Sequence, residues 1–112
     1  MIQVSVTQKE NPLIIKLEGR LDALTASDCE VAIREHIKDF YTNSLYFEVA
    51  NLEYISSAGL RIFLLLINEY ESTDRKIGII APNEMVLEVF EISGIIDFVD
   101  VFESESKAIS SF

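Results

Sequence analysis

Two consecutive serines, Ser56 and Ser57, stand where a buried strand is predicted to give way to a helix. A serine in this place can simply cap the helix, because its oxygen accepts a hydrogen bond from a backbone N–H of the first turn. The free N–H groups and the helix dipole also favour an anion at the same point. A hydroxyl there can therefore serve as a cap, a nucleophile, a phosphoryl acceptor or a contact for a small ligand.

The other chemically distinctive residue is Asp22, in the predicted turn Gly19–Thr25. As a structural residue it would close the turn or cap a helix. As a functional residue its carboxylate would face the serine turn and hydrogen-bond a hydroxyl or hold a cation beside a phosphate. Gly59 lets a partner backbone approach closely or serves helix packing alone. Turns at the carboxyl ends of parallel strands meet at one edge of a sheet, so we expect Gly19–Thr25 and Asn51–Gly59 to converge.

The N-terminal elements follow from the hydrophobic pattern. Apolar and polar residues alternate over Ile2–Val6 and again over Leu13–Leu17, which predicts an antiparallel hairpin whose second strand ends at Gly19. Apolar residues at helical spacing predict an amphipathic helix over Thr25–Phe40, with the threonine as its N-cap. Leu45–Val49 predicts the next strand, and a helix between two strands indicates a parallel crossover.

The second half of the chain centres on Leu60–Tyr70, which is apolar on nearly every side. Its length favours a buried helix over a strand. The remaining predicted elements are a strand, a capped helix, a last strand and a short terminal helix, over Ile77–Ala81, Asn83–Ile92, Phe98–Val101 and Glu103–Phe112. The order β-β-α-β-α-β-α-β-α predicts an α/β fold. Its mixed sheet has an antiparallel N-terminal hairpin and is covered, chiefly on one face, by about four helices.

Composition limits the function further. The 112 residues carry 9 Lys+Arg against 19 Asp+Glu, a net charge of −10, and 49% are hydrophobic, which predicts one folded domain over residues 1–112. The acidity argues against nucleic-acid binding. The single cysteine, Cys29, excludes a disulfide framework and fits a reducing, cytoplasmic location. The longest apolar run, Ile62–Ile67, is too short to span a membrane. No metal-ligand spacing or glycine-rich phosphate loop is present, so no metal or cofactor is predicted.

Three motifs of this chain resemble the STAS domain of bacterial anti-sigma factor antagonists. They are Gly19-x-Leu21-Asp22, the segment Tyr54–Arg61, and Ile92–Ile95. The middle motif is specific, and the resemblance covers essentially the whole chain with the elements in the family's order. It implies a partner-switching regulator that is not an enzyme. Such a regulator binds a GHKL-type serine kinase that doubles as an anti-sigma factor, is phosphorylated on a serine at a helix start, and is restored by a phosphatase.

Aligned on Gly59, the family's phosphoacceptor serine falls on Ser57. The family often has Asp immediately before that serine, where this chain has Ser56, so Asp22 is the acid expected nearby. Arg61 is a cation in an acidic chain and can pair with a partner carboxylate. The predicted phosphosite neighbourhood and partner-binding surface consists of Asp22, Ser56, Ala58, Gly59 and Arg61.

The sequence leaves two other functions to consider. A hydrolase with Ser57 as nucleophile and His36 in a triad lacks the required glycine two residues before the serine, where Ile55 stands. STAS proteins also act as accessory subunits of ABC-type lipid transporters, docking on the transporter ATPase through the same helix without a phosphoserine. Ser56 in place of Asp is the feature that favours this alternative.

Overall fold

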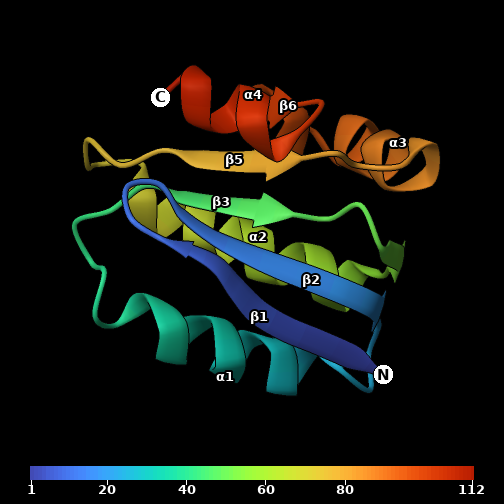
Figure 1. The fold of residues 1–112 in the computed structure, drawn as a ribbon. Helices are drawn as coiled ribbons and strands as arrows, with labels where there is room; N and C mark the ends of the chain where they lie inside the picture. The colour runs from blue at the N-terminus through green and yellow to red at the C-terminus, as the bar shows by residue number, and fades with distance from the viewer.

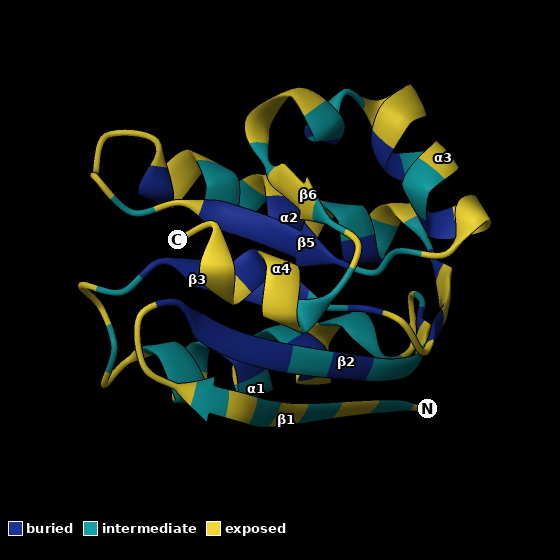
Figure 2. Cartoon of the chain, turned by 45° about the horizontal axis from the view of Figure 1, so that its top comes forward, coloured by how far each residue is buried: buried dark blue, intermediate teal, exposed yellow.

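The N-terminal hairpin forms as predicted. In the computed structural model, which describes residues 1–112, β1 (Ile2–Lys9) pairs antiparallel with β2 (Leu13–Leu21). Residues of β1 alternate between half-buried and exposed, whereas β2 is buried at most positions because strands flank it on both sides (Figure 2). The prediction that Gly19 ends the second strand is wrong. Gly19 has a φ of +107°, and the strand continues past it to Leu21.

The other strands lie parallel to β2 and to one another (Figure 1). The sheet order is β1-β2-β3-β5-β6, where β3 is Leu45–Glu48, β5 is Ile77–Ile80 and β6 is Asp100–Phe102. A short additional strand, β4 (Leu52–Ile55), pairs parallel with the end of β2 beyond β3.

Strand β4 lies inside Asn51–Gly59, which the sequence pattern predicts as one turn, so this strand is not predicted. Its two buried residues, Leu52 and Ile55, enclose two exposed ones. Buried residues three apart do not have the period of two that is typical of a strand, and four residues are too few to indicate a helix. Strand β4 is therefore identified only by its pairing with β2.

Three helices cover one face of the sheet. They are α1 (Ala26–Ile37), α2 (Ser57–Tyr70) and α3 (Glu84–Ser93), and α4 (Glu105–Ser110) packs on the opposite face (Figure 2). The predicted last strand is wrong at its start. Gly94 adopts a left-handed conformation with φ of 82°, after which Ile95–Phe98 forms a short 3-10 helix, η1.

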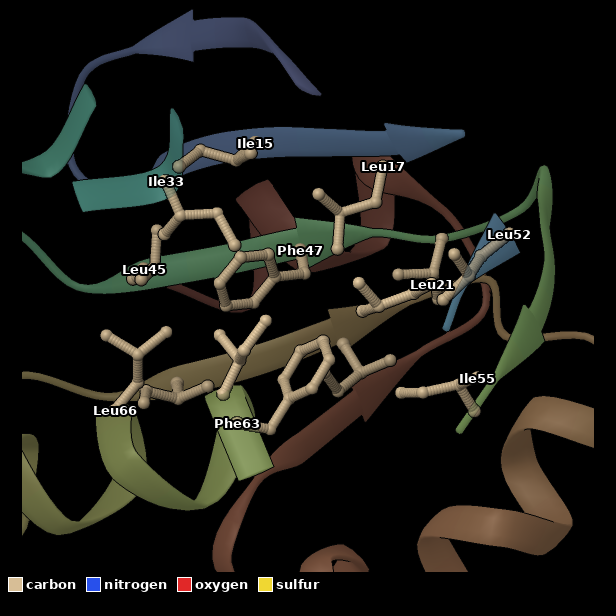
Figure 3. Packing of buried hydrophobic residues seen from close by; sticks show 14 of the residues in the cluster. Ile15, Leu17, Leu21, Ile33, Leu45, Phe47, Leu52, Ile55, Phe63 and Leu66 are labelled. Atoms are coloured by element: carbon tan, nitrogen blue, oxygen red, sulfur yellow. The ribbon is translucent and has the colours of Figure 1, made fainter. Parts of the chain in front are cut away.

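The main core lies between the sheet and these three helices (Figure 3). Phe63 of α2 is central to it, with its ring centroid 5.0 Å from that of Phe47 on β3 and 5.3 Å from that of Phe90 on α3. The central helix predicted over Leu60–Tyr70 is α2, and its five buried residues are more than those of any other helix, although Leu64 on its outer face is 49% exposed. A smaller apolar cluster under α4 contains Ile14, Tyr46, Ile80 and Ala108.

Candidate functional site

The two predicted turns meet at the carboxyl ends of β2 and β4. Leu21 and Ile55 are paired residues in these parallel strands, and the N–H of Ser56 donates to the carbonyl oxygen of Leu21 at 2.9 Å. Asp22 and Ser56 therefore each follow one member of the same residue pair. The turn after β2, residues 22–25 (the Asp22 turn), and the turn after β4, residues 56–57 (the serine turn), therefore converge as expected.

The Asp22 turn is closed by its own hydrogen bonds. Oδ1 of Asp22 accepts from the N–H of Leu24 at 3.0 Å, and from the N–H and hydroxyl of Thr25, each at 3.2 Å. The Thr25 hydroxyl shares its one proton between Oδ1 and the carbonyl oxygen of Arg20, to which it donates at 2.8 Å, and the N–H of Asp22 donates to the Thr25 oxygen at 3.0 Å. Desolvation opposes ionisation of Asp22, but the hydrogen bonds from Leu24 and Thr25 hold the pKa of its carboxyl below the usual value. The carboxylate thus acts first as the residue that closes the turn before α1.

The second carboxylate oxygen of Asp22 faces Arg20, whose Nε lies 3.8 Å from Oδ2. The Arg20 guanidinium also lies over the ring of Tyr54, 4.5 Å from its centroid. Arg20 and Tyr54 are cross-strand neighbours between β2 and β4. Sequence reasoning did not assign a role to this pair, because their contact depends on the strand β4 that had no periodic signal.

Only one of the two hydroxyls in the serine turn makes a hydrogen bond within the chain. Ser56 is the N-cap of α2, with extended backbone (φ −96°, ψ 177°), and its Oγ accepts from the N–H of Gly59 at 3.4 Å. Ser57 is the first residue of the helix, is exposed, and its hydroxyl makes no hydrogen bond within the protein. The first turn of α2 contains no acidic residue, so no carboxylate offsets the positive end of the helix dipole.

Gly59 brings α2 close to the end of β2. A Cβ on this buried glycine would lie 2.7 Å from Cγ of Leu21 and 3.0 Å from Cγ1 of Ile55. Packing within the chain thus accounts for the glycine. Its neighbour Ala58 is half-buried.

Arg61 lies one turn beyond Ser57 on α2, is exposed, and makes no ion pair within the chain. Leu64 follows at the spacing that places all three on one helix face. Beside the serine turn, Leu24 of the Asp22 turn is 90% exposed. The arrangement is a surface with a free hydroxyl, a free cation and exposed apolar side chains.

Other features of the chain lie away from this surface. His36 is in the last turn of α1, at the end far from Asp22, and no hydrogen bond joins it to Ser57. A cavity of about 610 Å³ lies at the starts of β3 and β5, lined by residues that include Ser44 and Lys76. No group of three His, Cys, Asp or Glu side chains is placed to hold a metal ion, and none of the helices has the length and apolar character needed to cross a membrane.

Comparisons with known proteins agree with one another. The family model of the STAS domain matches residues 3–108. The putative anti-sigma factor antagonist BtrV of Bordetella bronchiseptica is 27% identical, over 99% of this chain and 95% of that protein. An anti-sigma factor antagonist structure from Mycobacterium paratuberculosis superposes with a TM-score of 0.83 at 20% identity, covering 99% of this chain and 93% of that one. Phosphorylated SpoIIAA of Bacillus superposes with a TM-score of 0.71 at 21% identity, covering 99% and 98%.

Proposed function

Since the chain belongs to the STAS domain family, we propose that it is an anti-sigma factor antagonist that works by partner switching. Its partner is an anti-sigma factor that is also a GHKL-type serine kinase. The unphosphorylated protein binds this partner, phosphorylation releases it, and a phosphatase restores the binding form. The observation that carries the proposal is the free hydroxyl of Ser57 at the start of α2.

The hydrogen bonding favours Ser57 over Ser56 as the acceptor. Ser56 is half-buried, and its Oγ accepts a hydrogen bond from the N–H of Gly59, so a phosphate on Ser56 would remove the helix cap. Ser57 is exposed, and its hydroxyl makes no hydrogen bond within the chain. A phosphate on it would meet the free N–H groups at the helix start, where an anion is favoured.

The transfer itself needs only the hydroxyl from this chain. The Ser57 oxygen attacks the γ-phosphorus of ATP held by the kinase, an O–P bond forms, and the bond to the β-phosphate oxygen breaks. ADP leaves, and the hydroxyl proton passes to a base of the kinase. The chain supplies the nucleophile, and the partner supplies the catalytic groups.

The exposed face of α2 is the docking surface in this proposal. Arg61 offers an unpaired cation to a partner carboxylate, and Leu64 offers apolar area. Phosphorylation would add about −1.5 to −2 charges at Ser57. Burying that group against a partner costs desolvation, and it repels carboxylates or ATP phosphates opposite, so the complex separates.

The deciding experiment incubates the chain with its cognate kinase and ATP and maps the modified residue by mass spectrometry. We expect phosphate on Ser57, none on a Ser57→Ala variant that still binds, and weakened binding by Ser57→Asp. A Ser56→Ala variant is the matched control and should still be modified. Phosphate on Ser56 would move the acceptor by one residue. Absence of phosphate from both serines, with binding intact, would contradict the switch.

A second candidate function is a docking subunit of an ABC-type lipid transporter. The feature that favours it is Ser56, because the residue directly before Ser57 is then not a carboxylate. Asp22 does not replace that carboxylate fully, since its Oδ1 accepts hydrogen bonds from Leu24 and Thr25. Affinity capture from the host distinguishes the two. Recovery of a transporter ATPase without a kinase-like anti-sigma factor would support this second function.

A further inference from the structure

The open sheet has two free edges that differ sharply in charge. At one edge, β6 is three residues long, begins with Asp100 and is followed directly by Glu103. At the other, β1 is eight residues long and has no charged residue before Lys9. Figure 1 shows β1 at its edge with no strand beyond it. In a chain with net charge −10, β1 thus has seven consecutive residues, Ile2–Gln8, without a charged side chain, and the one carboxylate hydrogen-bonded to this segment is Glu105, which accepts from the Thr7 hydroxyl.

The first part of β1 is also regular. Its pairing with β2 is uninterrupted over Ile2–Val6, and the register shift falls later, between Val6 and Gln8. Charges, prolines and bulges usually prevent an edge strand from pairing with a strand of another chain, and Ile2–Val6 has none of them. Its backbone groups on the free edge are therefore available to another strand.

The same segment is symmetric about Val4. Ile2, Val4 and Val6 are half-buried and pack at the margin of the main core, while Gln3 and Ser5 point to the other face and are exposed. The apolar-polar alternation reads the same in both directions. An antiparallel copy of the strand therefore presents apolar residues to apolar residues and polar residues to polar residues.

We infer that β1 pairs antiparallel with β1 of a second copy of this chain, about a two-fold axis at Val4. Ile2 then lies opposite Val6 of the second copy, and Gln3 lies opposite Ser5. The two sheets become continuous, and the half-buried side chains of Ile2, Val4 and Val6 complete their burial. A second copy is the occupant because Ile2–Val6 is self-complementary and has no charged side chain of its own to repel an identical strand.

The pairing is independent of the serine turn. Strand β2 separates β1 from β4, so the dimer does not use the exposed face of α2. The edge is short, which predicts a weak association that is visible only at high protein concentration.

Sedimentation velocity over a concentration series tests the dimer. We expect the weight-average mass to rise towards twice that of the monomer. A Gln3→Lys/Ser5→Lys variant sets introduced lysines opposite each other across the axis and should remain monomeric at concentrations where the parent chain is dimeric. A Gln3→Lys/Ser5→Glu variant sets lysine opposite glutamate and should dimerise at least as well as the parent.

The two variants differ at one position and separate this interface from general charge effects. The double-lysine variant lowers the magnitude of the net charge, whereas the lysine-glutamate variant leaves it at −10. General repulsion alone therefore predicts the opposite order of association. Because Ser5 lies across from Lys16 within the monomer, thermal unfolding of both variants checks that each is folded.

Hydrogen exchange gives a readout that needs no variant. Amides of Ile2–Val6 on the free edge should exchange more slowly as protein concentration rises, while those of β6 should not change. A parent chain that stays monomeric at every concentration, or a dimer that neither variant alters, would overturn the inference.

Discussion

The Asp22 turn and the serine turn have the same position in the fold but different hydrogen bonding. Each follows a parallel strand, each begins a helix, and the residues before them, Leu21 and Ile55, are paired. In the Asp22 turn the polar side chains are joined to each other and to the backbone. In the serine turn Ser56 caps the helix, and Ser57 has no partner in the chain. Folding thus occupies the polar groups of one turn and leaves a hydroxyl available in the other.

The largest expected effect comes from a change that disturbs both turns. Gly59→Val would place a side chain against Leu21 and Ile55. Leu21 directly precedes the Asp22 turn, and Ile55 directly precedes the serine turn. We expect a loss of about 1–3 kcal/mol in the free energy of unfolding, as for other overpacked sites. Urea unfolding measures it. Ala58→Val adds a valine one position earlier and should cost less than about 1 kcal/mol. Equal losses in the two variants would contradict the close packing at Gly59.

A substitution in the Asp22 turn should destabilise the fold more than one in the serine turn. Thr25→Val keeps the shape of the side chain but removes the hydroxyl that bonds to Arg20 and Asp22. The free energy of unfolding should fall by about 1–2 kcal/mol. Ser57→Ala should change it by no more than about 0.5 kcal/mol. The difference between the turns would be refuted by a Ser57→Ala loss as large as that of Thr25→Val.

Acid should weaken the Asp22 turn. Although desolvation acts in the other direction, the hydrogen bonds from Leu24 and Thr25 lower the pKa of the Asp22 carboxyl below its ordinary value. Its contribution is therefore complete above the unfolded-state pKa, about 3.9, and is lost as pH falls through the lower folded-state pKa. In unfolding measured from pH 7 downward, the advantage of the parent over Asp22→Asn should shrink below about pH 4. A constant difference across that range would exclude ionisation of Asp22 as its cause.

Arg61→Glu should have the smallest effect on stability and a clear effect on binding. The side chain is exposed and has no ion pair within the chain, so the free energy of unfolding should change by no more than about 0.5 kcal/mol. Affinity for the kinase that we propose as partner, measured by calorimetry, should fall. Lys9→Glu makes the same charge change at the far end of the β1–β2 hairpin and should bind normally. Unaltered binding by Arg61→Glu would remove the face of α2 from the interface.

Local pattern was sufficient for much of the fold. Alternation over Ile2–Val6 and Leu13–Leu17 predicts the hairpin, because a strand with one buried face has a period of two. The apolar run in Leu60–Tyr70 predicts the central helix, and Asn83 marks the start of α3 by capping it. Each of these signals lies within one segment of the chain. They also limit the candidate chemistry to the residues around Asp22 and Ser57.

Only the tertiary structure decided what the polar groups of those two turns do. Strand β4 forms because Leu52 and Ile55 are buried beside the end of β2. The same pairing places the Tyr54 ring against the Arg20 guanidinium. In the same way, the residue pattern could not show that Ser56 hydrogen-bonds to the backbone of α2 whereas Ser57 makes no hydrogen bond within the chain. Periodicity records which side of a segment is buried, but a hydrogen-bond partner depends on which segments meet and at what register.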